Sequence, residues 1–478
     1  MESMTSKIVQ NFGKNVSFTP DAYAEPKNQD EVLQLLNQYR DQSIRVVASR
    51  HAWSDAIQTD GLLISLKHLD QVQVDEERQS VVVGAGCQLK HLLPQLEAQG
   101  LTLPSLGLID EQTVAGATAT GTHGSGKNSL SHYVRRVRVA HYDSPTGETT
   151  LTDIDAGAEL QAARCSLGLL GVIVEVELET RPVYQVQEHS SRHETLESVL
   201  EAEKEFPLQQ FFLMPWSWEL YGQHRLEIDQ SRSWTAGLYR FYWHLGIDWG
   251  LHLVMFVLVK ILRFRGLIRS FYRYLLPWVY VRHWRVTDES HRTLTMQHEL
   301  FRHIEIEFFV TRTNLPAALD DVKQTIKFFG GQKPEGTPNK PFPDQYRGTY
   351  FHHYPICVRR VLSDDTLISM SSPIEEGDNE DWYAISLISY EWPSRRKGFF
   401  EFAKLLASSL KSHFNARCHW GKYNPLDRKI NEQLYPQLNE FREIVRQFDP
   451  QGRFANDWLR DVLLGPSIDP THRSVNDL

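Results

Sequence analysis

The spacing of apolar residues divides the first 184 residues into short helices and strands. Two stretches, 30–40 and 89–99, carry apolar residues at helical spacing, and the second ends at Gly100. Four apolar runs have the length or the alternation typical of strands: 44–48, 62–66, 80–83 and 172–179. The pattern predicts an α+β domain over residues 15–184.

A second α+β region follows over residues 185–409, where strands are expected at 303–310 and 383–390. Residues 410–465 form a C-terminal segment with an amphipathic helix expected over 429–448. Residues 466–478 are a polar tail. The chain length of 478 residues also suits two domains.

An aromatic and basic stretch interrupts the second region over residues 241–284. Its centre, 251–259, is apolar on all sides except at His252. Several cations follow among further apolar residues: Lys260, Arg263, Arg265, Arg269 and Arg273. Asp248 and Lys260 bracket an apolar run shorter than the about 20 residues of a spanning helix. Two interpretations remain: a pair of buried helices, or a monotopic surface that dips into lipid headgroups.

Charge and cysteine content narrow the class of protein. The net charge of −9 argues against a general nucleic-acid binder. The four cysteines form no CxxC pair, so we expect reduced thiols, no disulfide framework and no metal site. The first fifteen residues contain no apolar core of signal-peptide length, so the expected location is the cytoplasm or the cytoplasmic side of a membrane.

Small residues concentrate over 114–126, a segment that includes Gly116, Gly121, Gly124 and Gly126. Such a segment allows backbone N–H groups to approach a pyrophosphate, but glycine content alone favours a tight structural turn. The segment 46–54, which leaves an expected strand and contains Arg50 and His51, has the same two interpretations. Neither segment is specific when taken alone.

Taken together and in order, four motifs resemble a known family. They are RHAWSD after a strand, SLGLIDEQTVAGATATGTHGSG, SLGLLGVIVEVELETRP, and HWGK followed by FDPQGRFAND. The chain resembles FAD-linked oxidases of the vanillyl-alcohol-oxidase superfamily, in the branch of sugar-1,4-lactone and alditol oxidases, over about 15–184 and 415–465. The resemblance implies a PCMH-type FAD-binding domain of two subdomains, an α+β cap that binds substrate, and a C-terminal tail that returns to the flavin.

The resemblance also implies the residues that contact FAD. They are Val46, Val47, Ala48, Ser49, Arg50, His51, Ala52, Thr113, Gly116, Ala117, Thr118, Ala119 and Ile173. His51 matches the position where covalent members bond an imidazole nitrogen to the flavin methyl carbon. Cys87 and Cys165 do not match the cysteine of bicovalent members, so we expect a single bond.

Three residues match catalytic positions of the family. Gly107 matches a turn beside the flavin ring, where a glycine leaves space for dioxygen. Lys422 matches a lysine near flavin N1, where an ammonium stabilises developing negative charge. Glu307 matches a carboxylate that binds a substrate hydroxyl. Phe309 stands where polyol oxidases carry an arginine, and Leu108 stands where they carry a serine, so the site is expected to be more apolar.

The implied activity is oxidation of a CH–OH group by hydride transfer to flavin N5, with dioxygen reduced to hydrogen peroxide. The implied substrate is a small polyhydroxy molecule such as a sugar lactone or an alditol. One alternative is a membrane-associated dehydrogenase that passes electrons to a quinone or redox protein, or that acts on a lipid-linked sugar. The other alternative is a scaffold protein without catalytic activity. The presence of Phe309 in place of the arginine favours it, whereas the presence of His51, Gly107 and Lys422 argues against it.

Overall fold

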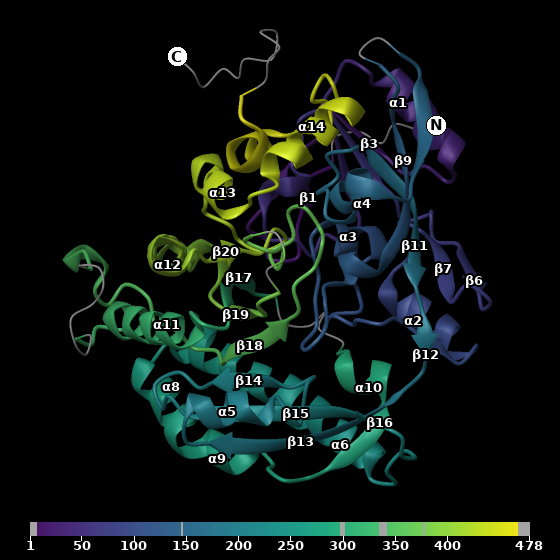
Figure 1. Ribbon diagram of the computed structural model, residues 1–478. Helices are drawn as coiled ribbons and strands as arrows, with labels where there is room; N and C mark the ends of the chain where they lie inside the picture. The colour runs from purple at the N-terminus through teal and green to yellow at the C-terminus, as the bar shows by residue number, and fades with distance from the viewer. Residues whose placement is uncertain are drawn as a thin grey trace.

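The computed structural model describes residues 7–144, 147–296, 302–333, 342–375, 377 and 379–466 (Figure 1). The N-terminal domain contains a parallel sheet in the order β3-β5-β4 and an antiparallel sheet in the order β10-β9-β11-β7-β6. Their strands are β3 (Ala22–Ala24), β4 (Ile44–Val47), β5 (Leu62–Ser65), β6 (Val72–Asp75), β7 (Ser80–Gly84), β9 (Val134–Tyr142), β10 (Thr149–Ile154) and β11 (Val172–Glu179). Helices α1 (Gln29–Gln38), α2 (Leu89–Glu97), α3 (Val114–Ala119) and α4 (Gly157–Arg164) complete the domain.

Local sequence explains several of these elements. The side chain of Asn28 accepts a hydrogen bond from the backbone N–H of Glu31, and acidic residues occupy the first turn of α1, where they offset the helix dipole. Strand β11 alternates between buried and half-buried residues along its C-terminal half, as its sequence predicts. The expected helices and strands of this domain are therefore confirmed, with ends that differ by one or two residues.

The cap is built on one antiparallel sheet in the order β16-β13-β15-β14-β18-β19-β17-β20. Its strands are β13 (Gln185–His193), β14 (Gln210–Leu213), β15 (Leu220–Ile228), β16 (Val286–Glu289), β17 (Ile304–Thr311), β18 (Ile356–Val361), β19 (Trp382–Ser389) and β20 (Arg417–Cys418). Its helices include α5 (Leu196–Ala202), α10 (Ser290–Leu294), α11 (Leu315–Phe329) and α12 (Lys397–Phe414). Every residue of β17 is buried, because β19 and β20 flank the strand and α11 and α12 pack against it.

The C-terminal segment departs from the prediction in two ways. The helix expected over 429–448 is two helices, α13 (Arg428–Leu434) and α14 (Leu438–Phe448), because Pro436 stands between them and proline disfavours a helical residue before it. The border expected at residue 409 lies inside α12. Helix α14 packs against α4 of the N-terminal domain (Figure 1). Beyond α14, the backbone N–H of Ile44 donates to the carbonyl of Arg453 at 2.8 Å. Residues 467–478 of the expected polar tail lie outside the described residues.

The N-terminal segment also belongs to the first domain, which therefore begins before residue 15. Strand β1 (Val9–Gln10) pairs with β2 (Ser17–Phe18), and short strands β8 (Leu101–Thr102) and β12 (Arg181–Pro182) form another pair. All four cysteines are buried and free.

The aromatic and basic stretch forms a helical hairpin against the cap, at the end of the molecule far from both termini (Figure 1). The first arm comprises α6 (Ala236–Tyr242), η3 (Trp243–Leu251), α7 (His252–Met255) and η4 (Phe256–Leu262); the second comprises α8 (Arg265–Ser270), η5 (Phe271–Leu275) and α9 (Leu276–Val279). The first arm is 27 residues long with a mean hydropathy of 1.8 in its most apolar window, of which 17% is buried. We expected no helix here to be long enough to span a bilayer. That expectation is wrong, because the first arm is long and apolar enough to do so when judged by length and composition alone. The interpretation as fully buried helices is also wrong, because one face of each arm is exposed.

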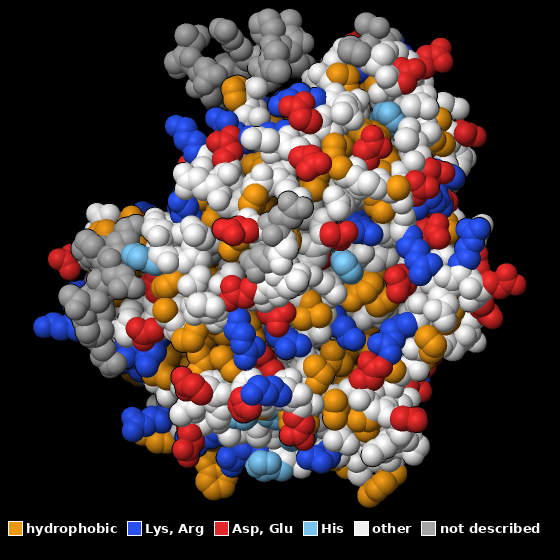
Figure 2. All heavy atoms as spheres, in the orientation of Figure 1, with side chains coloured by type: hydrophobic (Ala, Val, Ile, Leu, Met, Phe, Trp, Pro, Cys, Tyr) orange, Lys and Arg blue, Asp and Glu red, His pale blue; other side chains and the backbone are white. Residues whose placement is uncertain are grey.

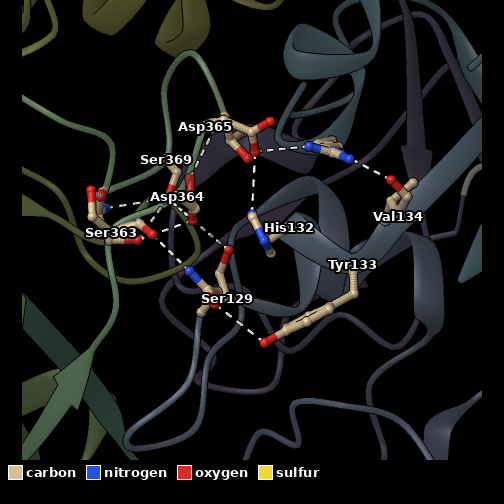
Figure 3. Close-up of polar contacts among 12 residues, drawn as sticks. Ser129, His132, Tyr133, Val134, Ser363, Asp364, Asp365 and Ser369 are labelled. Atoms are coloured by element: carbon tan, nitrogen blue, oxygen red, sulfur yellow. Dashed lines mark hydrogen bonds and ion pairs between the residues drawn. The ribbon is translucent and has the colours of Figure 1, made fainter. Parts of the chain in front are cut away.

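A polar loop of the cap fixes its position on the N-terminal domain (Figure 3). Buried Asp364 accepts hydrogen bonds from the hydroxyls of Ser129, at 2.9 Å, and Ser369, at 3.0 Å. Asp365 contacts His132 at 3.2 Å, so two consecutive carboxylates of the loop meet the segment around residue 130. These contacts fix the relative placement of the two domains and therefore the shape of the space between them.

Candidate active site

A cavity of about 630 Å³ lies between the N-terminal domain and the cap. Residues 48–53, the glycine-rich segment and the turn at Gly168 line one part of it. Residues of β15, β17 and the helical hairpin line the other part. This volume is within the range of about 300–1,000 Å³ that is typical of cofactor and ligand sites.

The loop after β4 is fixed by contacts with both ends of the chain. The side chain of Asn11 donates to the carbonyl of Ala52 at 2.8 Å, and the N–H of Phe12 donates to the carbonyl of Arg50 at 2.8 Å. The N–H of Trp53 donates to the carbonyl of Gly421 at 2.8 Å. Arg50 has a φ of 60°, a left-handed conformation that is uncommon for a residue with a side chain. The surrounding hydrogen bonds hold this strained residue in place.

The cavity wall includes the expected cofactor residues except Val47, Ala117 and Thr118. Val47 packs into a small core cluster behind β4, since neighbouring residues of a strand point to opposite faces. Ala117 is in the main core, and the Thr118 hydroxyl donates to the carbonyl of Val114 at 3.0 Å. These three residues are therefore directed away from the cavity by the local strand and helix geometry.

His51 faces the cavity and stacks on Phe12 with ring centroids 5.0 Å apart. Burial, followed by the positive charges of His303 and Lys422, lowers the pKa of His51 to about 4. Its Nδ1 atom is buried and has no hydrogen-bond partner among the described residues. The imidazole is therefore neutral near pH 7 and carries a lone pair that can form a bond.

The glycines of the 114–126 segment occupy different environments. Gly116 lines the cavity, whereas a Cβ at Gly124 would lie 2.4 Å from the carbonyl oxygen of Leu106. A Cβ at Gly126 would lie 1.8 Å from the carbonyl oxygen of Pro207, and Gly126 has a φ of +74°. The structural-turn interpretation therefore holds for Gly124 and Gly126, whereas the cofactor-cradle interpretation stays a prediction for Gly116.

Gly107 lies in a turn that packs tightly against the same segment. A Cβ there would lie 2.6 Å from Cγ2 of Thr122, so the space beside this glycine is already filled. The structure therefore gives a packing reason for Gly107, and its part in dioxygen access stays a prediction.

Strand β17 places two carboxylates on the cavity wall. Glu305 and Glu307 are two residues apart, so both face the cavity, and both are buried. The ammonium of Lys422 donates to Glu305 at 2.5 Å and lies 4.5 Å above the ring of Trp53. The Ser386 hydroxyl also donates to Glu305. Burial would raise the pKa of Glu305, but Lys422 and His303 outweigh it and hold that pKa well below its usual value.

Glu307 is paired with an imidazole. Its carboxylate lies 3.5 Å from Nε2 of His123, and its Oε1 atom is buried without a hydrogen-bond partner in the described part of the chain. Burial would raise the pKa of Glu307, but His123 and then Lys422 outweigh it and lower that pKa to about 2. Nδ1 of His123 lies 3.0 Å from the carbonyl oxygen of Gly124 and must therefore carry a hydrogen. Nε2 is then the ring nitrogen that faces Glu307.

His419 completes this cluster. Its Nδ1 atom accepts a hydrogen bond from the backbone N–H of Gly421 at 2.9 Å, and burial lowers its pKa to about 3. The neutral tautomer therefore carries its hydrogen on Nε2. Ligand atoms of His123, Glu307 and His419 lie within 4.8 Å of one another, close enough to share a cation, so the expected lack of a metal site stays a prediction.

Beyond these groups the cavity continues into a chamber under the hairpin. Its apolar side chains are Phe212, Met214, Trp243, Ile247, Leu251 and Leu276. Leu108 also lines the cavity, as expected. Phe309 does not line it and instead packs edge-on against His123, at 5.1 Å between ring centroids.

Two pairs of polar side chains in the chamber bind each other. Arg225 donates to Glu188 at 2.6 Å, and Gln210 donates to Gln223 at 2.6 Å. Both pairs are buried. Their hydrogen-bonding capacity is thus largely used within the protein.

Several site residues were missed by reasoning from the sequence. Glu305 could have been found from the two-residue period that places Glu307, and His123 and His419 stand inside motifs that were already recognised. Arg225 and Glu188 carry no local signal, because only the pairing of β13 with β15 brings them together.

Known proteins match the chain over most of its length. A family model described as an FAD binding domain matches residues 20–150, and one described as D-arabinono-1,4-lactone oxidase matches residues 176–462. A long-chain alcohol oxidase of an uncultured marine euryarchaeote is 47% identical, covering 95% of this chain and 96% of that protein. The L-gulonolactone oxidase of Mus musculus is 27% identical, covering 95% and 97%. Cholesterol oxidase from B. sterolicum shares the fold, with a TM-score of 0.74, 15% identity and coverage of 96% and 97%.

Proposed function

The chain belongs to the D-arabinono-1,4-lactone oxidase family of FAD-dependent oxidoreductases acting on CH–OH donors, and from that premise we propose that its substrate is a long-chain primary alcohol. The alcohol loses two hydrogens to become an aldehyde, and dioxygen takes them up as hydrogen peroxide. The observation that carries the proposal is the apolar chamber, which is continuous with the cofactor end of the cavity. The relative at 47% identity, a long-chain alcohol oxidase, supports the same substrate class.

The chamber favours an alkyl chain over a polyol. A polyol needs hydrogen-bonding groups that are free to bind it, and a site built for hydroxyls discriminates through such groups. Here Arg225 is held by Glu188, and Gln210 is held by Gln223. An alkyl chain requires none of them and gains about 0.8 kcal/mol for each methylene removed from water.

The residues at the cofactor end provide the chemistry of a hydroxyl group. Bound FAD supplies the hydride acceptor for the carbinol carbon. Glu307 is ionised, and its buried Oε1, 3.5 Å from Nε2 of His123, forms no hydrogen bond with a described residue, so it is placed to accept the hydrogen bond of the substrate hydroxyl. The same carboxylate is the proposed acceptor of the hydroxyl proton as the hydride leaves, and Nε2 of His123 lies 3.5 Å from it. Lys422, held by Glu305, keeps positive charge at the end of the cavity where negative charge develops.

His51 is proposed to hold FAD through a single covalent bond. Its neutral imidazole and its unpartnered Nδ1 atom fit that role. Acid precipitation of the holoprotein should leave flavin fluorescence in the pellet, and the His51→Ala variant should release the flavin to the supernatant. Release from the unaltered protein would contradict the bond and leave the cofactor assignment intact.

A sugar lactone or alditol is the second candidate, because the family model that covers most of the cap is named for a lactone oxidase. Peroxide release from primary alcohols of increasing length, lactones and alditols distinguishes the two. We expect kcat/KM to rise by about three- to fourfold per methylene until the chamber is filled, from about 0.8 kcal/mol each. Faster turnover of lactones with a flat alcohol series would support the second candidate. Turnover only with an added quinone would contradict dioxygen as the acceptor.

A pair of variants on the same helix tests the chamber itself. Leu251 lines the cavity, and Leu253, two residues away, is exposed on the outer face. We expect Leu251→Asn to lower kcat/KM for long alcohols and to spare short ones. Leu253→Asn, assayed in detergent solution, should leave the series unchanged. Equal effects of the two variants would contradict the placement of the alkyl chain.

A further inference from the structure

The outer face of the helical hairpin is an apolar surface that no described part of the chain covers. Its exposed side chains are Trp234, Leu238, Phe241, Leu245, Trp249, Leu253, Ile261, Leu262, Phe264, Leu267, Tyr274, Leu275, Trp278, Val279 and Val281. Outside residues 234–281, the large apolar side chains exposed among the described residues are Ile8, Ile374 and Trp392. Figure 2 shows hydrophobic side chains protruding at the lower edge, the end of the molecule where α6 and α9 lie in Figure 1.

The charge of this segment is opposite to that of the whole protein. Residues 234–285 contain eight lysines and arginines and one acidic residue, Asp248, a net of +7 in a chain whose net charge is −9. Asp248 lines the cavity and is therefore on the inner side. Arg263, Arg273 and Arg282 are exposed and form no ion pair with a residue that the structure describes.

We propose that this face binds the surface of an anionic phospholipid bilayer. Tryptophan, tyrosine and arginine beside exposed leucine and phenylalanine are the composition of a helix that lies in the bilayer interface. A second copy of the chain is a poor occupant, because a two-fold dimer would bring two faces of the same positive charge together.

The hairpin lies in the interface and does not cross the bilayer. The inner residues Leu251, Met255, Tyr272 and Leu276 are buried in one cluster with side chains of the cap. A helix that crossed the membrane would have to leave this cluster and expose it. Apolar contact on one face and protein contact on the other is the arrangement of a monotopic protein.

The same helices also line the cavity, so docking would place the chamber close to the bilayer. The inference about substrate entry that follows rests on the proposed alcohol substrate. Ile247 and Leu251 face the chamber, and Leu253, on the same arm, faces outward. A long-chain alcohol dissolved in the bilayer therefore needs to pass only the thickness of the hairpin to reach the chamber. The inference is that the enzyme takes its substrate from the membrane.

Flotation of the holoprotein with vesicles tests the docking without measuring turnover. We expect binding to phosphatidylcholine vesicles that contain phosphatidylglycerol, and weaker binding to phosphatidylcholine alone or at high salt. The triple variant Leu253→Gln, Phe264→Gln, Trp278→Gln should bind these vesicles at least about tenfold more weakly, since the three side chains are 57%, 64% and 88% exposed and do not line the cavity. Ile8→Gln, which changes a 68% exposed apolar side chain in the other domain, is the matched control and should bind normally.

The charge contribution has its own variant, Arg273→Gln with Arg282→Gln, which should weaken binding to the anionic vesicles and reduce its salt dependence. Unaltered protein that floats with neither vesicle would overturn the docking and leave the oxidase proposal standing. A dimer that dissociates in the triple variant would also overturn it and assign the face to a second copy. Normal docking with no oxidation of any alcohol would contradict the proposed function instead.

Supply of substrate from the bilayer is tested by comparing two substrates. The triple variant should oxidise a short soluble alcohol at the normal rate and lose most of its activity on a long-chain alcohol embedded in vesicles. Equal activity of variant and unaltered protein on the embedded alcohol would overturn this part of the inference.

Discussion

Replacing Glu305 by Gln removes the negative partner of Lys422 while preserving the size of the side chain. The carboxylate is buried at 5% exposure and accepts from the ammonium at 2.5 Å. Two unit charges about 4 Å apart attract by about 4 kcal/mol at an effective dielectric constant of about 20. Loss of one partner of a buried pair costs about 3–5 kcal/mol, because the other charge stays buried. Lys422 is partly exposed to the cavity, so we expect Glu305→Gln to lower the free energy of unfolding by about 3 kcal/mol.

A double-mutant cycle isolates the interaction between these two groups. The single variants Glu305→Gln and Lys422→Met each remove one charge of the pair, whereas the double variant removes both. Urea unfolding at equal flavin occupancy, followed by tryptophan fluorescence, gives the four free energies. We expect the double variant to be about 3 kcal/mol more stable than the sum of the single effects predicts. An interaction energy below about 1 kcal/mol would refute the reasoning.

The same pair predicts a pH dependence. Because the pKa of Glu305 in the folded protein is well below its usual 4.5, its contribution to stability is complete above that usual value and is lost as the pH falls toward the folded pKa. The stability difference between the unaltered protein and Glu305→Gln should therefore narrow below about pH 4.5. A difference that stays constant down to the acid transition would show that the charge is not its source.

Three further predictions concern catalysis, packing and substrate binding. Glu307→Gln should lower kcat by about 10²–10⁴-fold with little change in KM, and unchanged turnover in a peroxide assay would exclude Glu307 as the proton acceptor. Gly126→Ala should lower the free energy of unfolding by about 2 kcal/mol more than Gly100→Ala, as measured by thermal unfolding. Both glycines have a positive φ, but only a Cβ at residue 126 would clash with a backbone atom. Equal losses of stability would contradict the clash. Burial raises the pKa of Asp248 to about 7, so KM for a long alcohol should rise above that pH as the carboxylate ionises beside the alkyl chain, and Asp248→Asn should abolish the rise.

The sequence determined the local elements and the groups that one element presents together. Periodicity predicted the strands around the cofactor loop, and the two-residue period of β17 also places Glu305, which was not predicted, on the same face as Glu307. The ordered motifs located His51, Gly116 and Lys422, each of which lines the cavity. Such features depend on residues close in the chain, so they can be read without knowing what packs against them.

Only the tertiary structure decided which distant groups meet. Lys422 binds Glu305 across 117 residues, and the N-terminal segment reaches Arg50 and Ala52, although the domain was expected to begin later. The centre of the hairpin's first arm, 251–259, is apolar on all sides except at His252, so its hydrophobic pattern could not show which face is covered. The cap sheet covers one face and leaves the other exposed, because burial depends on the shape of the neighbouring surface and not on composition alone.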